Sequence, residues 1–246
     1  LLVQGEAGVG KTRLVEDFAN HLRWQGVCVL WGRCYEFERL LPYQPLGEAL
    51  QALLSTLAPG ELADLPAWIL AGLARLVPTL SEKLPGLTVS STAPLEEEQT
   101  HLFEGVARFL ADLSRDSALV LILDDLHWAT ESTLQMIHYL ARHLAAHPVL
   151  IVGALRPEAV EGQSALVSFQ RQLDREGQVQ SWNLAGLSPQ AIETMLAEMS
   201  GSGQAVALLA RRLYAETEGN PFFLIESLKS LFDRGLVSLE GGTWRG

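Results

Sequence analysis

Continuous apolar runs, bounded by glycine, proline or polar residues, recur along most of the chain. Such runs are typical of strands that are buried on both faces of a parallel sheet, whereas strands with one solvated face alternate apolar and polar residues. The pattern predicts five core strands, at residues 1–4, 27–32, 118–123, 149–155 and 179–184.

Between these runs, apolar residues recur at the i, i+3 and i+4 spacing of amphipathic helices. This spacing predicts a helix that starts near Lys11 and ends at Gly26, and further helices over 95–114, 130–146 and 164–176. Pro148 is placed to end the third of these helices. Alternating strands and helices predict an α/β fold, with a five-stranded, mainly parallel sheet flanked by helices.

Residues 33–94 differ in composition, because they hold seven of the eleven prolines. Proline interrupts helices, so we expect only short helical pieces here. The segment is also rich in leucine and alanine, and it can therefore bury apolar surface. We interpret it as a helical insertion in a core domain of residues 1–186.

Only helical patterns follow the fifth predicted strand. Ser188-Pro189 and Asn220-Pro221 each combine a favourable N-cap with proline at the first helical position, and a further helix is expected over about 204–218. These signals predict a small helical lid at residues 187–235. Residues 236–246, with Gly241-Gly242 inside them, could start a strand pair or a winged helix and are expected to begin a further domain.

The first strand leads into Gly5-Glu6-Ala7-Gly8-Val9-Gly10-Lys11-Thr12, a G-x-x-x-x-G-K-T phosphate-binding loop. Its glycines allow backbone conformations that turn N–H groups toward phosphates, and the following helix adds its positive end. Lys11 supplies a mobile charge, and the Thr12 hydroxyl is placed to hold Mg²⁺. The alternative is an ordinary glycine-rich turn, but the strand–loop–helix context favours nucleotide binding.

Asp124 and Asp125 follow the third predicted strand, at the carboxyl edge where open α/β sheets bind ligands. We expect Asp124 to hold the Mg²⁺ shell and Asp125 to orient or deprotonate the attacking water. Alone, Asp125 could equally be the N-cap of the next turn. His127 and Trp128 come next, and we interpret both as packed residues without a catalytic role.

Arg156 stands at the end of the fourth predicted strand, also at the carboxyl edge of the sheet. A guanidinium there could reach a γ-phosphate and distinguish ATP from ADP. A surface ion pair with Glu158 is the alternative, and position alone does not decide between them.

The formal net charge of −11 argues against direct nucleic-acid binding by this part of the protein, because phosphate neutralisation needs clustered Lys and Arg. There is no apolar run long enough to span a membrane and no signal peptide, so we expect a cytoplasmic protein. Cys28 and Cys34 are then interpreted as reduced thiols. Since Leu1 already lies in a predicted strand, we expect the natural protein to be longer.

Four ordered motifs make the chain resemble the STAND class of AAA+ ATPase modules, in particular those of LuxR-type, cyclase-linked or TPR-linked bacterial regulators. They are the phosphate loop, Leu121–Ala129, Gly153–Glu158 and Glu218–Leu224. The Leu41–Pro45 segment is similar as well. This resemblance implies a switch that is closed with ADP and opened by ATP plus an inducer, with possible self-association and covalently linked effector or sensor domains.

The resemblance also implies that Gly219 and Pro221 approach the adenine, and it strengthens the sensor role of Arg156. Motor-type relatives place glutamate where this chain has Asp125, which suggests a slow, Mg²⁺-dependent ATPase. Two alternatives remain: an oligomeric motor or loader with an arginine finger such as Arg171 or Arg175, and a scaffold that binds nucleotide without hydrolysis. GTP is less expected than ATP, because the chain has no Asn/Thr-Lys-x-Asp segment to read guanine.

Overall fold

The computed structural model describes residues 1–38, 40–84, 87, 94–157, 164–200, 203–240 and 243–245. The chain divides into two compact units. The first consists of Leu1–Gln4 and Thr12–Trp182, and the second of Gly5–Lys11 and Asn183–Gly246.

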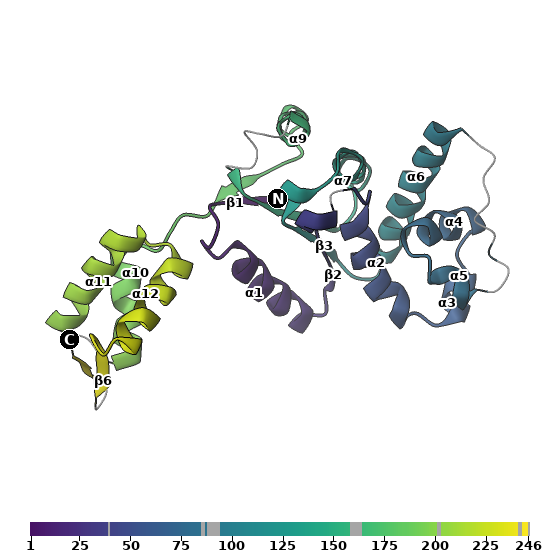
Figure 1. Ribbon diagram of the computed structural model, residues 1–246. Helices are drawn as coiled ribbons and strands as arrows, with labels where there is room; N and C mark the ends of the chain where they lie inside the picture. Colours follow the sequence, from purple (N-terminus) through teal and green to yellow (C-terminus); the bar gives the residue numbers. More distant parts are fainter. Residues whose placement is uncertain are drawn as a thin grey trace. The chain divides into compact units, whose positions relative to one another are not determined.

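A five-stranded sheet forms the centre of the first unit (Figure 1). Its strand order is β2-β3-β4-β1-β5, and β3 pairs in parallel with β2 and β4, as β4 does with β1. The strands are β1 (Leu2–Gln4), β2 (Cys28–Arg33), β3 (Leu119–Asp124), β4 (Val149–Leu155) and β5 (Ser181–Asn183). The predicted α/β fold is therefore confirmed.

Strand β3 explains why the core strands are continuous apolar runs. Leu119, Leu121 and Leu123 belong to the core on one face of the sheet, while Val120 and Ile122 belong to a second core on the other. Helix α1 (Lys11–Trp24) covers the second core, and α7 (Glu131–His143) and α9 (Ser164–Arg175) cover the first (Figure 1). A strand covered on both faces has no position for a solvated side chain.

Two elements differ from the prediction. Strand β5 is not a core strand: it has a neighbour on one side only, and its three residues are exposed. Helix α7 ends at His143, three residues early, and Pro148 does not terminate it. The chain turns over residues 144–147 so that it can enter β4 at Val149.

Within residues 33–94, which follow β2, the structure describes the short 3-10 helix η1 (Glu36–Glu38) and the helices α2 (Gln44–Thr56), α3 (Pro59–Ala63), α4 (Ala67–Leu76) and α5 (Leu80–Lys83). Helix α6 (Leu95–Leu113) comes next and leads toward β3. The expectation that prolines allow only short pieces is wrong for α2, which runs over 13 residues. Pro45 lies in its first turn, where the missing N–H would have no helical partner.

The second unit contains α10 (Pro189–Ser200), α11 (Gln204–Thr217) and α12 (Pro221–Asp233), packed around a small apolar core. Both predicted N-caps are confirmed: Ser188 Oγ accepts from the Ala191 N–H at 3.1 Å, and Asn220 Oδ1 from the Phe222 N–H at 3.1 Å. Strands β6 (Ser238–Glu240) and β7 (Thr243–Arg245) form an antiparallel pair, while Gly241-Gly242 lies outside the described residues. Among the described helices, none is both long and apolar enough to cross a membrane.

Candidate functional site

The loop between β1 and α1 has the backbone that the phosphate-loop motif predicts. Gly5, Gly8 and Gly10 have φ angles of +157°, +80° and +101°, values that L-residues with a Cβ rarely adopt. Helix α1 then begins at Lys11, as expected. The loop therefore leads directly into a helix N-terminus, whose N–H groups and positive dipole favour anions.

Lys11 is 7% exposed, and its side chain folds back onto the loop. Its Nζ donates hydrogen bonds to the carbonyl oxygens of Gly5 at 2.6 Å and Glu6 at 2.8 Å. The positive charge is thus held within the loop itself. It can neutralise a phosphate bound there after exchanging these carbonyl acceptors for phosphate oxygens.

Thr12 and Asp124, the two predicted metal-holding residues, are in direct contact in the first unit. Thr12 Oγ1 donates to Asp124 Oδ2 at 2.9 Å, and the Asp125 N–H donates to Asp124 Oδ1 at 2.9 Å. Asp124 is 2% exposed. Burial, and to a lesser extent the charge of Asp125, raise the pKa of Asp124, while the Thr12 hydrogen bond acts in the opposite direction.

These hard oxygen donors suit Mg²⁺, which usually binds one or two carboxylates together with phosphate oxygens and water. Within the described residues, no group of three or more His, Cys, Asp or Glu side chains is arranged to hold a metal ion. A Mg²⁺ ion held by Thr12 and Asp124 would need further oxygen ligands, such as phosphate oxygens or water.

Asp125 binds Arg33, a residue that the sequence analysis did not single out. The guanidinium donates to Asp125 Oδ2 from Nη2 at 2.7 Å and from Nε at 3.0 Å. This contact is also the main cause that raises the pKa of Arg33. Arg33 is the last residue of β2 and lies opposite Asp124 in the β2–β3 register.

The backbone of Asp125 is left-handed, with φ +54°. It precedes the 3-10 helix η2 (Leu126–Trp128), but its carboxylate makes no capping hydrogen bond to that turn. The N-cap interpretation is therefore not supported. His127 is buried next to Trp128, with ring centroids 4.5 Å apart, as expected for packed residues.

Arg156 directly follows β4, at the edge of the sheet where Asp124 ends β3. Its Nε atom is buried and finds no hydrogen-bond partner within the described part of the chain. Glu158, the alternative partner, lies outside the described residues. Within the described part of the chain, Arg156 shares this edge of the sheet with the two aspartates but is not hydrogen-bonded to either of them.

In the second unit, the lid residues contact the phosphate loop. Asn220 Nδ2 donates to the Ala7 carbonyl at 2.8 Å, and the Phe222 N–H donates to the Gly8 carbonyl at 3.2 Å. Gly219 and Pro221, the residues expected near the adenine, flank Asn220. The sequence analysis interpreted Asn220 only as a helix cap and missed its contact with the loop.

Both cysteines are free thiols, and the buried Cys34 donates its backbone N–H to the Asp124 carbonyl at 3.0 Å. Burial and then the charges of Asp125, Asp124 and Glu48 raise the pKa of Cys34 to about 12. The thiol therefore stays protonated at neutral pH and is a poor nucleophile. Burial is the main cause of this raised pKa, and the neighbouring carboxylates add to it.

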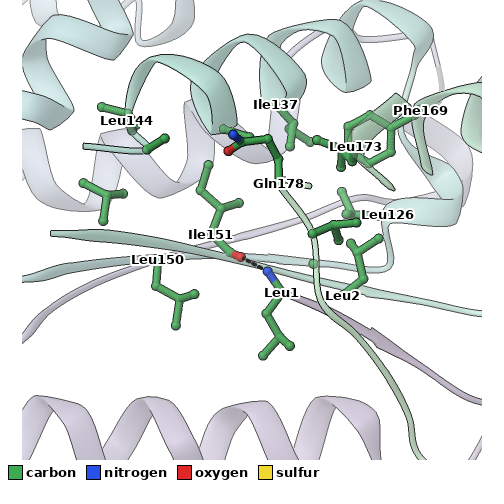
Figure 2. A pocket seen from close by; sticks show the side chains of 15 residues that line it. Leu1, Leu2, Leu126, Ile137, Leu144, Leu150, Ile151, Phe169, Leu173 and Gln178 are labelled. Atoms are coloured by element: carbon green, nitrogen blue, oxygen red, sulfur yellow. Dashed lines mark hydrogen bonds between the residues drawn. The ribbon is translucent and has the colours of Figure 1, made fainter. Parts of the chain in front are cut away.

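A cavity of about 160 Å³ lies between β4, α7 and α9 (Figure 2). Its walls are apolar side chains such as Ile137, Leu144 and Phe169, and Gln178 is the only polar side chain among the described lining residues. Because its described lining has no charged side chain, this cavity does not suit a phosphate ligand.

A glycine-rich loop leading into a helix, a threonine bonded to a buried aspartate at the end of β3, and the strand order of the sheet define a P-loop nucleotide-binding protein. Residues 1–152 match the family model of the AAA ATPase domain. The chain belongs to this family.

The chain is also similar to three known proteins. An uncharacterised protein, R02095, of Rhizobium meliloti (strain 1021) is 25% identical over 166 residues, which is 64% of this chain but 16% of that protein. The DNA-bound ORC1 protein of Aeropyrum pernix is 15% identical, with a TM-score of 0.47, over 100% of this chain and 56% of that chain. A STAND protein with a tetratricopeptide repeat sensor from Pyrococcus horikoshii is 19% identical, with a TM-score of 0.43. The likeness covers 91% of this chain and 26% of that chain.

Proposed function

We propose that the chain is an ATP-binding, slowly hydrolysing switch module of a signal-transduction or transcription regulator of the STAND class. The hydrogen-bonded Arg33–Asp125 pair is the observation that carries this proposal. In this pair the Arg33 guanidinium donates two hydrogen bonds to the carboxylate that we predict to be catalytic. A carboxylate held in this way is less available to activate water, and this fits a module whose hydrolysis is slow and conditional.

The phosphate loop, Gly5–Lys11, supplies N–H donors and the Lys11 charge for the phosphates of ATP or ADP. Thr12 and Asp124 would hold Mg²⁺, which supplies positive charge to the phosphate oxygens when bound. Support comes from their direct hydrogen bond and from the raised pKa of Asp124, which marks a buried carboxylate that a cation would stabilise.

Asp125 is the proposed base that orients or deprotonates water, and its release from Arg33 is then a condition for turnover. Arg156 is the proposed sensor, because its buried Nε lacks a partner among the described residues and could donate to a γ-phosphate. Gly219 and Pro221 are proposed to line the adenine, by the resemblance to STAND modules.

The chain spans only a small part of R02095, which supports the view that it is one module of a longer protein. We place its ATPase core at residues 1–186 and its lid at 187–235, with effector or sensor domains covalently linked to them. ATP-dependent self-association belongs to the same proposal. Direct contact with nucleic acid by this module does not, because the charge of −11 opposes it.

Binding of fluorescent ATP, ADP and GTP, followed by steady-state hydrolysis with and without Mg²⁺, tests the proposal on the purified chain. We expect binding of both adenine nucleotides in preference to GTP, and Mg²⁺-dependent turnover far below once per second. ATP-induced rings with strongly stimulated turnover would favour the motor or loader. Nucleotide binding with no hydrolysis under single-turnover conditions would favour the scaffold that binds nucleotide without hydrolysing it.

A further inference from the structure

The first turn of the lid helix α12 lies directly on the phosphate loop, and both belong to the second unit. Asn220 Nδ2 and the Phe222 N–H donate to the consecutive carbonyls of Ala7 and Gly8, at 2.8 and 3.2 Å. The N–H groups of a first helical turn have no helical acceptor, so the loop satisfies one of them. Residues 213 positions apart are thus joined by hydrogen bonds.

The side chain of Asn220 performs two roles at once. Its Oδ1 accepts from the Phe222 N–H at 3.1 Å and so caps α12, while its Nδ2 holds the Ala7 carbonyl. Only Asn among the common N-cap residues offers an acceptor for the helix and an amide donor for a second partner. The side chain is 7% exposed, which limits competition from water for these bonds.

The turn before Asn220 is fixed by hydrogen bonds. Thr217 Oγ1 donates to the Leu213 carbonyl at 2.7 Å and accepts from the Gly219 N–H at 3.3 Å. The Gly219 carbonyl in turn accepts from the Leu187 N–H at 2.7 Å. Asn220 is therefore presented to the loop from a firmly bonded turn.

The loop is fitted closely to the lid as well. A Cβ on Gly8 would lie 2.7 Å from Phe222 Cβ and 2.8 Å from Asn220 Oδ1. The G-x-x-x-x-G-K-T motif itself does not require glycine at this position. Its positive φ and the close approach of α12 both do.

From this geometry we infer that Asn220 is a positioning residue that couples the conformation of the phosphate loop to the attachment of the lid. Its amide holds the loop carbonyl of Ala7, so a change in the loop loosens the first turn of α12, and loosening of α12 frees the loop. One consequence rests on the function proposed above: if the loop binds a nucleotide, the coupling slows release of that nucleotide.

The test variant is Asn220→Ser, which keeps an N-cap oxygen for α12 and loses the amide donor. Asn220→Asp is a second variant of nearly the same shape, whose carboxylate caps but cannot donate. Ser188→Ala is the matched control: it removes the N-cap of α10 in the same unit, and among the described residues Ser188 caps that helix without bonding to the phosphate loop. Thermal unfolding confirms that each variant folds.

Hydrogen exchange of the nucleotide-free chain is the first readout. We expect faster exchange in segments 5–12 and 221–224 together in both Asn220 variants, and in neither segment of Ser188→Ala. Unchanged exchange of residues 5–12 in both Asn220 variants would overturn the inference. Equal acceleration in Ser188→Ala would overturn it too, because general loosening of the lid would then be the cause.

Dissociation of fluorescent ADP is the second readout. Loss of one hydrogen bond, worth about 1 kcal/mol, predicts about fivefold faster release from Asn220→Ser and no change for Ser188→Ala. Release at the wild-type rate from Asn220→Ser would contradict the coupling. If the wild-type chain binds no nucleotide, the proposed function fails, and the exchange experiment alone decides whether Asn220 couples loop and lid.

Discussion

Arg33 at the end of β2 holds Asp125, the residue after β3, through two hydrogen bonds to a single carboxylate oxygen, at 2.7 and 3.0 Å. The β2–β3 register produces this contact, because it places Arg33 opposite Asp124, one residue before its partner. The other oxygen, Asp125 Oδ1, lies 3.9 Å from His127 Nε2. The Asp125 carboxylate is thus engaged by a cation in this structure.

Arg33→Gln is expected to raise the single-turnover rate of ATP hydrolysis, because it frees the Asp125 carboxylate for water. The Arg33 side chain is 46% exposed, so solvent screens the pair. We therefore expect about a three- to tenfold increase, below the effect of a buried charged hydrogen bond. Arg13→Gln, which breaks an exposed i, i+4 pair with Asp17, is the matched control. A slower rate would show that Arg33 positions Asp125 for catalysis.

Asp125→Asn should bind ATP with wild-type affinity and lose hydrolysis. The amide cannot accept a proton, and general base catalysis contributes about 100-fold or more. Rapid-quench measurement of product formed on the enzyme, alongside equilibrium binding, separates the two effects. Equal turnover in Asp125→Asn and wild type would remove Asp125 from the mechanism.

Lys11→Ala should weaken binding of both ATP and ADP by about 10- to 100-fold, the range expected for losing a charged hydrogen bond to phosphate. The variant also leaves the Gly5 and Glu6 carbonyls without their ammonium donor. Titration calorimetry with each nucleotide measures the change. Unaltered affinity would mean that the loop does not bind phosphate.

Arg156→Ala should lower the preference for ATP over ADP by about fivefold or more, since a guanidinium–phosphate hydrogen bond exceeds about 1 kcal/mol. The measurement is the ratio of the two dissociation constants, because a general loss of affinity leaves that ratio unchanged. Arg142→Ala, at an exposed surface pair with Glu176, serves as the control. A ratio equal to that of wild type would assign Arg156 a structural role.

The sequence predicted what is encoded locally. Continuous apolar runs located the strands, and the Asn-Pro and Ser-Pro caps located the starts of α12 and α10, because a cap acts within one helical turn. Arg33 was missed because its partner lies 92 residues away and depends on the pairing of β2 with β3. A strand order cannot be read from apolar runs alone.

Dependence on distant parts of the chain also explains why the sequence analysis missed the loop contact of Asn220 and the exposure of β5. The contact of Asn220 with Ala7 follows from tertiary packing, so its sequence signal showed only the cap. The exposure of β5 depends on its place at the edge of the sheet, which its composition does not reveal. Arg33 could have been flagged as a charged residue ending a strand at the ligand-binding edge.

Asp124→Asn is expected to stabilise the Mg²⁺-free chain while it removes Mg²⁺-dependent nucleotide binding. Burial and the nearby Asp125 raise the pKa of Asp124 above its ordinary value of 3.8, so its charged form opposes folding. The folded state then binds this proton more tightly than the unfolded state does. Stability is consequently lost as the pH rises through the folded pKa, and the penalty vanishes below the unfolded pKa.

The melting temperature at pH 7, without metal or nucleotide, should therefore rise by about 2 to 4 °C in Asp124→Asn for a gain of about 1 kcal/mol. The Asn carbonyl oxygen can still accept from the Asp125 N–H, and its amide nitrogen can donate to Thr12 Oγ1, so the Thr12 contact can be kept with its donor and acceptor exchanged. Repeating the melt at pH values near and below 3.8 should shrink the gain. A lower melting temperature at pH 7 would show that the carboxylate is compensated by its hydrogen bonds, and its role as a cation-binding group would lose this support.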